Sequence, residues 1–192
     1  ARGAIADHLT NLGYENFKIE STRAFETIFR IRYEVKEQPL VSILIPNKDH
    51  LSDLKRCIDS IVDKSTYENY EIIVIENNSV TDEIFAYYEE IGKHPRIRVV
   101  KFEEGEFNYS RINNFGARFA KGEFLLLLNN DTQVITVNWI EEMLMYGLRE
   151  DVGVVGAKLY YENKTIQHAG IALGLGLHRT AGHTHHKVAW EN

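Results

Sequence analysis

Three consecutive side chains with oxygen atoms follow an unbroken apolar stretch, and they are the first candidates for a binding site. Residues 124–128 are apolar throughout, and Asn129, Asn130 and Asp131 come directly after them. An apolar run bounded by polar residues predicts a strand that is buried on both faces, in the middle of a parallel sheet. Ligands of open α/β sheets bind at the carboxyl ends of such strands. The three side chains are therefore expected at the edge of a site, although Asn-Asn-Asp is also common where a turn simply ends a strand.

Two further strands are predicted to end in polar side chains of the same kind. The apolar run 40–46 leads into Asn47-Lys48-Asp49, and the run 70–75 leads into Glu76-Asn77-Asn78. Because the carboxyl ends of parallel strands share one edge of a sheet, the acids and amides of three strands would converge there. Such a set of hydrogen-bond acceptors and hard oxygen ligands suits a uracil- or thymine-type base, a ribose and a divalent cation.

The elements that would position these residues alternate along the chain. Helical apolar stripes lie between strands predicted at 40–46, 70–75, 97–102, 124–128 and 152–159. This order predicts an α/β fold with a doubly wound, mostly parallel central sheet and helices on both faces. Gly116 lies inside a predicted helix, where glycine costs about 1 kcal/mol relative to alanine, so it is expected to allow a close approach to the sheet or a ligand. Asp49 is predicted to cap the helix that follows it, and Ser79 with Asp82 the next one.

Composition and charge restrict the class of protein and of partner. The chain has 192 residues, of which 44% are apolar and 26% charged, with a net charge of −6. It contains no basic run, so no nucleic-acid partner is expected. Cys57 is the single cysteine, which excludes an intrachain disulfide, and it is expected in the core. No signal peptide and no apolar run of roughly 18 residues are present, so a cytoplasmic location is predicted.

The two ends of the sequence carry less of this chemistry. Residues 1–38 are expected to form an arm or linker from a preceding region, followed by one domain over 39–192. Because the chain begins with Ala1 and ends in a polar run, it is expected to be an excised part of a longer protein. His168 is expected to be a core residue. An exposed loop rather than a metal site is predicted for the histidine cluster near the end of the sequence, which is His178, His183, His185 and His186.

Two familiar nucleotide sites are excluded by missing motifs. No G-x-G-x-x-G follows the first buried strand, which argues against a dinucleotide-binding site, and no G-x-x-x-x-G-K-[ST] is present, which excludes a P-loop. A nucleotidyltransferase would need a glycine-rich basic loop after that strand, and residues 46–50 contain no glycine.

Four motifs, taken together, resemble the family 2 glycosyltransferases with the GT-A fold. Residues 41–47 are similar to the family's opening strand, and residues 73–79 to its second-strand motif. Residues 114–123 are similar to its N-x-G-x-x-x-A-x-G-[ED] helix, and residues 127–131 stand where a D-x-D motif is expected. The motifs come in the family's order over roughly residues 40–172. The resemblance implies a GT-A-type fold with a Rossmann-like nucleotide-binding half, and it is greatest to bacterial cell-surface polysaccharide and rhamnan-type transferases.

The resemblance implies a role for each matched residue. Asp131 would bind Mn²⁺ or Mg²⁺ together with the diphosphate, and Asn129 would be a weaker, uncharged ligand in place of the first acid of D-x-D. Glu76 would replace the aspartate that hydrogen-bonds the base or ribose. The other positions implied to contact the nucleotide are Pro46, Asn47, Asn78, Arg111, Asn114 and Asn130.

The implied reaction transfers a sugar, with inversion, from a UDP- or dTDP-linked donor to a saccharide or lipid-linked acceptor. Its general base is expected beyond Asn192, so this chain is predicted to be inactive by itself. A lipid-linked acceptor would place the protein at the inner face of the cytoplasmic membrane as a peripheral protein. The main alternative is a non-catalytic nucleotide-sugar binding or scaffold domain of a larger protein, because Asp131 is the single carboxylate of the presumed metal motif. The sequence does not indicate an oligomeric state.

Overall fold

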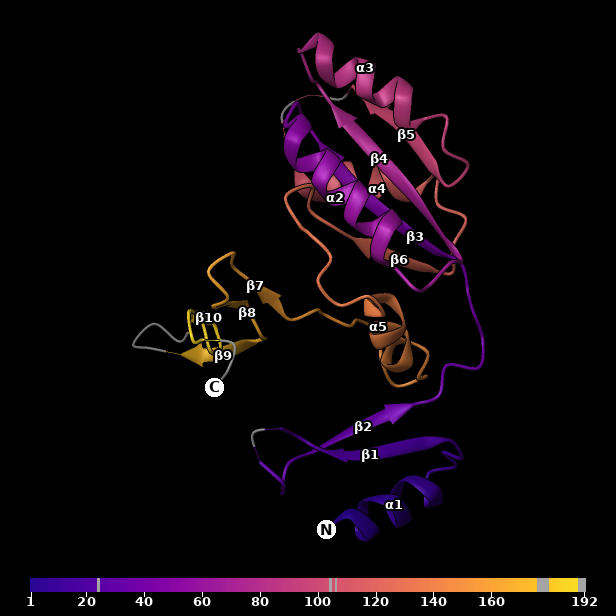
Figure 1. Cartoon of the computed structure of the whole chain (residues 1–192), viewed down its shortest axis with the longest axis vertical. Coiled ribbons are helices and arrows are strands. Elements are labelled where there is room, and N and C mark those ends of the chain that lie inside the picture. The colour runs from indigo at the N-terminus through magenta and orange to yellow at the C-terminus, as the bar shows by residue number, and fades with distance from the viewer. Residues whose placement is uncertain (24, 104, 106, 176–179, 190–192) are drawn as a thin grey trace. The chain divides into compact units, whose positions relative to one another are not determined.

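The computed structural model describes residues 1–23, 25–103, 105, 107–175 and 180–189 (Figure 1). They form two compact units, one comprising residues 36–140 and the other residues 1–35 with 141–192. None of the described helices is long and apolar enough to cross a membrane. The boundary predicted at residue 38 stays a prediction.

The first unit is built on a four-stranded parallel sheet. Its strands are β3 (Val41–Asn47), β4 (Tyr70–Asn77), β5 (Ile97–Phe102) and β6 (Phe124–Leu127). They are arranged in the order β5-β4-β3-β6, and every neighbouring pair is parallel. All four carboxyl ends therefore lie along one edge, which is the edge that the polar strand ends were predicted to share.

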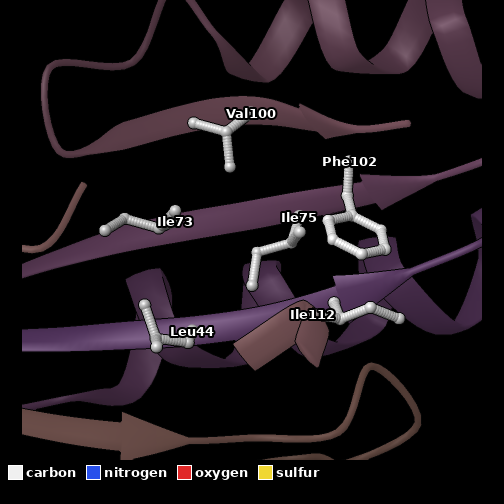
Figure 2. Packing of buried hydrophobic residues seen from close by; sticks show 6 residues of the cluster. All are labelled: Leu44, Ile73, Ile75, Val100, Phe102 and Ile112. Atoms are coloured by element: carbon white, nitrogen blue, oxygen red, sulfur yellow. The ribbon is translucent and has the colours of Figure 1, made fainter. Parts of the chain in front are cut away.

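Helices cover both faces of this sheet, as predicted. The helices α2 (Leu51–Lys64) and α3 (Asp82–Ile91) lie on one face and α4 (Tyr109–Ala117) on the other (Figure 1). Their apolar faces fit the fold because a strand buried on both sides must be covered twice. On the α4 side the buried cluster joins three strands to one helix (Figure 2), and its members are Leu44, Ile73, Ile75, Val100, Phe102 and Ile112.

Gly116 brings α4 into close contact with the sheet. A Cβ atom at this position would collide with Ile75 Cδ1 and lie 2.8 Å from Ile75 Cγ1. The expected close approach is thus confirmed, and it is to the sheet side chains. The missing side chain lets the helix pack directly on β4.

The prediction that 124–128 is a strand in the middle of the sheet is wrong. Among the described strands β6 lies at the edge and pairs with β3 alone. Its side chains alternate in burial, with Leu125 51% and Leu127 52% exposed. An apolar run shows that a strand has apolar surface on both faces, but it does not show which neighbouring elements cover that surface.

The second unit begins with α1 (Arg2–Asn11) and a hairpin of β1 (Phe17–Ser21) and β2 (Phe29–Tyr33). Arg30 and Arg32 of β2 form ion pairs with Glu142, and Tyr146 donates a hydrogen bond of 2.8 Å to the Ile31 carbonyl. Both partners belong to α5 (Trp139–Gly147). These contacts connect the two parts of the second unit that are far apart in sequence, the amino-terminal hairpin and α5.

Four short strands complete the second unit. They are β7 (Leu159–Tyr160), β8 (Ile166–His168), β9 (Ile171–Leu175) and β10 (Thr180–His183). The pairs β7–β8 and β9–β10 are antiparallel. The strand predicted at 152–159 is wrong except for Leu159, since 152–158 has no strand structure and Val154 is 91% exposed. Its apolar pattern fits a strand, but no described neighbour pairs with it.

Candidate functional site

The ends of β3 and β4 place two buried polar side chains next to each other. Asn47 and Glu76 are register partners in the parallel ladder, and both are almost completely buried. Glu76 Oε1 accepts a hydrogen bond of 2.5 Å from the backbone N–H of Ser79. Glu76 Oε2 is also buried, and no hydrogen bond reaches it within the described structure. A buried carboxylate oxygen without a donor is costly, so its position favours a ligand that supplies one.

The segment after β6 forms a tight turn next to Asn47. Thr132 Oγ1 donates to the Asn129 carbonyl at 2.8 Å, and Asn130 Nδ2 donates to Asn47 Oδ1 at 2.6 Å. The backbone carbonyl of Asn129 thus makes the turn that the Asn-Asn-Asp sequence indicated. The side chains of Asn129 and Asp131 are exposed. Asn130 connects the third strand end to the first, as the sequence predicted for the edge.

Cys57 packs underneath this turn from α2. Its Sγ atom lies 3.8 Å from the Asn129 carbonyl oxygen and 3.6 Å from Thr132 Oγ1. Burial raises the pKa of the Cys57 thiol, so the residue is a neutral support for the turn. The expected core position of Cys57 is confirmed.

Asn129 and Asp131 offer the oxygen ligands that Mg²⁺ and Mn²⁺ prefer. One amide oxygen and one carboxylate are too few for a metal site formed by protein alone. No group of three or more histidine, cysteine or acidic side chains in the described ranges is arranged to hold a metal ion. The donor set therefore fits a cation that obtains its remaining ligands from a diphosphate and water.

Asp49 fastens the loop after β3 to the loop after β4. Its Oδ1 atom accepts from the Val80 N–H at 2.9 Å and from the Thr81 N–H and Oγ1 at 3.1 Å. The predicted cap of the next helix is wrong, because the N-cap position of α2 is His50, which makes no side-chain cap hydrogen bond. The predicted Ser79 cap is also wrong, since Thr81 precedes α3. Asp49 has a φ of 54°, and its side chain bonds to the neighbouring loop.

Replacing Asp49 by asparagine is expected to reduce the acid sensitivity of the fold. Hydrogen bonds from the Val80 and Thr81 N–H groups lower the pKa of Asp49. Its ionised form therefore contributes stability that is present above the unfolded pKa of about 3.9 and is lost as the pH falls through the folded pKa. Urea midpoints of parent and Asp49→Asn should differ at pH 7, and the difference should shrink as the pH falls below about 3.9. A midpoint difference between parent and Asp49→Asn that stays constant with pH would refute this. The same pH dependence in the exposed control Asp63→Asn would also refute it.

The two predicted residues of α4 lie on the exposed side of the helix. Arg111 and Asn114 are exposed, and the Arg111 N–H bonds the capping side chain of Asn108 at 3.0 Å. Asn113 is buried instead, and its Oδ1 has no hydrogen-bond partner in the described structure. Because α4 follows the carboxyl end of β5, its first turn lies at the same edge as Glu76. Asn113 is a second buried acceptor at this end that the sequence motif did not single out.

The remaining predicted contacts are at the strand ends. Pro46 is half-buried next to Asn47, while Asn78 is exposed with a φ of 56° and donates to Asn77 Oδ1 at 3.2 Å. The structure therefore brings together Asn47, Glu76 and Asn130 most closely.

A hollow of about 520 Å³ lies elsewhere on the first unit. It is lined mainly by the starts of β4 and β5 and by the loop between α3 and β5, including Glu71, Arg96 and Arg98. These positions belong to the amino-terminal ends of the strands. The hollow is thus at the opposite edge from the polar strand ends.

Three histidines of the second unit, His168, His183 and His186, lie close together. His168 Nδ1 lies 3.1 Å from His183 Nδ1, and Tyr161 Oη lies 3.2 Å from His186 Nε2. His168 is half-buried and pairs with a side chain, so the expected backbone-bonded core position is wrong. His178 lies outside the described residues. As stated above, the described histidines do not form a three-ligand metal group.

The comparison with protein families agrees with this geometry. The model of glycosyl transferase family 2 matches residues 42–182. The chain belongs to that family. Its relative RfbC, an O-antigen biosynthesis protein of Myxococcus xanthus, is 37% identical over 172 residues, which are 90% of this chain and 13% of RfbC. Membership favours a transferase over the binding or scaffold domain that the sequence left open.

Two solved glycosyltransferases share the fold of this family 2 chain. One is a mannosyltransferase from Pyrobaculum calidifontis in complex with GDP-Man and Mn²⁺, with a TM-score of 0.55 at 17% identity. The match covers 62% of this chain and 35% of the mannosyltransferase chain. GalNAc-T7 with UDP, GalNAc and Mn²⁺ has a TM-score of 0.53 at 22% identity, covering 60% and 22%. These likenesses confirm the predicted GT-A-type fold.

Proposed function

We propose that the carboxyl edge of β3, β4 and β6 binds the nucleoside diphosphate of a sugar donor, UDP- or dTDP-linked. In the whole protein this edge would serve transfer of a hexosyl unit to a saccharide or lipid-linked acceptor during cell-surface polysaccharide synthesis. Support comes from the family, from a relative named for O-antigen biosynthesis and from two structures of the same fold that hold nucleotides and Mn²⁺.

The observation that carries the proposal is the buried, unpartnered Glu76 Oε2. Its twin oxygen is held by the Ser79 N–H, so the carboxylate cannot turn away without losing that bond. A nucleobase imide N–H or a ribose hydroxyl would supply the missing donor. Asn47, Pro46 and Asn78 would form the adjoining walls, with Asn130 fixed to Asn47. Arg111 and Asn114 are proposed to approach the nucleotide from α4.

Asp131, assisted by Asn129, is proposed to hold Mn²⁺ or Mg²⁺ together with the diphosphate. Such a cation offsets the negative charge that develops on the leaving diphosphate. The acceptor oxygen would attack the anomeric carbon from the face opposite the bond to phosphate, so that the configuration inverts as this bond breaks. The acceptor proton would pass to a carboxylate base, which we place beyond Asn192. Location at the inner membrane face is part of the same proposal.

Calorimetric titration with UDP, dTDP and GDP, each with Mn²⁺, tests the proposal, and Glu76→Gln supplies the decisive variant. In this variant the glutamine oxygen must accept the hydrogen bond from the Ser79 N–H, so the glutamine NH2 group takes the place of Oε2. The NH2 group would then face the N–H or O–H donor of the nucleotide and could not accept its hydrogen bond. Affinity is expected to fall about tenfold, the loss of one hydrogen bond to a charged group. The exposed Glu83→Gln is the control and should bind as the parent does.

Three results would count against this assignment. If none of the three nucleotides binds, the edge is not a donor site. If UDP or dTDP binds equally well to Glu76→Gln and to the parent, the role of Glu76 is wrong even though the site exists. Preference for GDP would overturn the predicted base.

A further inference from the structure

The hydroxyl of Tyr88 lies between the two loops that border the proposed nucleotide site. Tyr88 belongs to α3 and is buried. Asn47 Nδ2 donates to its hydroxyl at 2.8 Å, and Ser79 Oγ lies 3.4 Å away on the other side. Because Asn47 already donates to Tyr88, the Tyr88 proton is available to Ser79. One side chain from beneath therefore contacts the end of β3 and the loop after β4 at the same time.

These two contacts complete a continuous series of hydrogen bonds across the edge. Asn130 donates to Asn47 at 2.6 Å, and Asn47 donates to Tyr88. Tyr88 contacts Ser79, whose backbone N–H donates to Glu76. The phenol is thus one connection between the turn that carries Asp131 and the carboxylate of Glu76, and the hydrogen bonds of Asp49 are another. Removing the Tyr88 hydroxyl leaves Asp49 to hold the two loops together.

We propose that Tyr88 is a positioning residue of the nucleotide site, acting by holding Asn47 and Ser79 in place. This inference rests on the proposed function of the same edge. Tyr88 itself is buried in α3 beneath the loops, and it acts through residues that would contact the nucleotide. The helical pattern of the sequence explains Tyr88 as a core residue and does not indicate a role for its hydroxyl.

Loss of the hydroxyl should leave the fold intact. In Tyr88→Phe, Asn47 Nδ2 keeps its second bond, to the Asp49 carbonyl at 2.7 Å. Ser79 Oγ still accepts from the Asp49 N–H at 2.9 Å. Each side chain therefore keeps one hydrogen bond, only one of the two Asn47 amide hydrogens loses its acceptor, and the ring still fills its space. What changes is the restraint on the two loops.

Tyr87 supplies a matched control in the preceding position. It is also buried in α3 and has the same side chain, but its hydroxyl makes no hydrogen bond in the described structure. Tyr87→Phe and Tyr88→Phe thus remove the same atom from adjacent buried residues. A difference between them reports on the contacts of Tyr88.

The test measures UDP and dTDP affinity with Mn²⁺, together with urea midpoints, for the parent and both variants. Tyr88→Phe is expected to bind about five- to tenfold more weakly, the equivalent of one lost hydrogen bond, while Tyr87→Phe binds as the parent does. The Tyr87→Phe midpoint should stay close to the parent value, and that of Tyr88→Phe should fall slightly because one Asn47 hydrogen loses its acceptor. Ser79→Ala removes the same contact from the loop side, together with the bond from the Asp49 N–H, and should weaken binding at least as much, which keeps the test valid if Tyr88→Phe fails to fold.

Three results would overturn the inference. Equal affinity of Tyr88→Phe and parent would show that the hydroxyl does not position the site. Equal losses in both tyrosine variants would indicate a general effect on α3. A parent chain that binds neither nucleotide would remove the proposed function and this inference with it, which distinguishes the two failures.

Discussion

Replacing Asp131 by alanine is expected to abolish the effect of Mn²⁺ on nucleotide binding. The carboxylate is exposed at the turn after β6, and no hydrogen bond or ion pair of this side chain occurs in the described part of the chain. Its removal should leave the fold unchanged. Because it would be the single charged protein ligand of the cation, UDP affinity in Mn²⁺ should fall on the order of 100-fold, with little change in EDTA. Calorimetric titration of both proteins under both conditions measures this.

Asn129→Ala is the companion variant for Asp131→Ala. The Asn129 carbonyl accepts the Thr132 hydroxyl bond, and alanine keeps that carbonyl, so the turn should persist. As an uncharged ligand, the Asn129 side chain should contribute about tenfold, which is less than the carboxylate. If the Mn²⁺ dependence is unchanged in Asp131→Ala, the proposed cation role of Asp131 is wrong. If both variants lose the same affinity in Mn²⁺, Asp131 does not contribute more than Asn129.

Gly122→Ala is expected to have the largest effect on stability. A Cβ atom there would lie against the Leu40 carbonyl oxygen and 2.7 Å from the Ser42 nitrogen. These are backbone atoms of the approach to β3 and of β3 itself, so they cannot rotate away. The Gly122 N–H also donates to Ser42 Oγ at 2.9 Å. Separating the start of β6 from β3 should cost about 3 kcal/mol, near the upper end of the range for overpacking.

Urea unfolding of Gly122→Ala and Gly153→Ala measures this cost. A Cβ atom at Gly153 would meet nothing within 4 Å, so that control should stay within about 0.5 kcal/mol of the parent. Gly116→Ala should lie between them, since the neighbour there is the end of the flexible Ile75 side chain. Equal stability of Gly122→Ala and Gly153→Ala would show that the segment before β6 adjusts freely.

The parallel sheet could be predicted because its signals are local. The apolar runs that became β3, β4 and β5, and the helical stripes between them, are visible in windows shorter than one element. The exposure of Leu125 and Val154 could not be predicted in the same way. Whether an apolar strand is covered depends on segments far away in sequence, and the pattern of residues 152–159 carries no information about a pairing partner.

The candidate site was predictable at the level of the edge but not of its contacts. The strand ends placed Asn47, Glu76 and Asn130 together because parallel strands share an edge. The bonds from Asp49 to the loop after β4 depend on a positive φ at Asp49, which an aspartate before a helix does not indicate. Tyr88 was visible only as part of an apolar helix face, since its hydroxyl acquires a role from two loops that are distant in sequence.

The most direct test of the account is a map of backbone amide chemical shifts on titration with UDP and Mg²⁺, which, unlike paramagnetic Mn²⁺, does not broaden the signals of nearby amides. Binding at the carboxyl edge should shift the amides of residues 47–49, 76–79 and 129–132 first, and it should leave the starts of β4 and β5 unchanged. Shifts confined to Arg96, Arg98 and the rest of the hollow at the opposite edge would contradict the account. An unchanged spectrum at saturating nucleotide would contradict it equally.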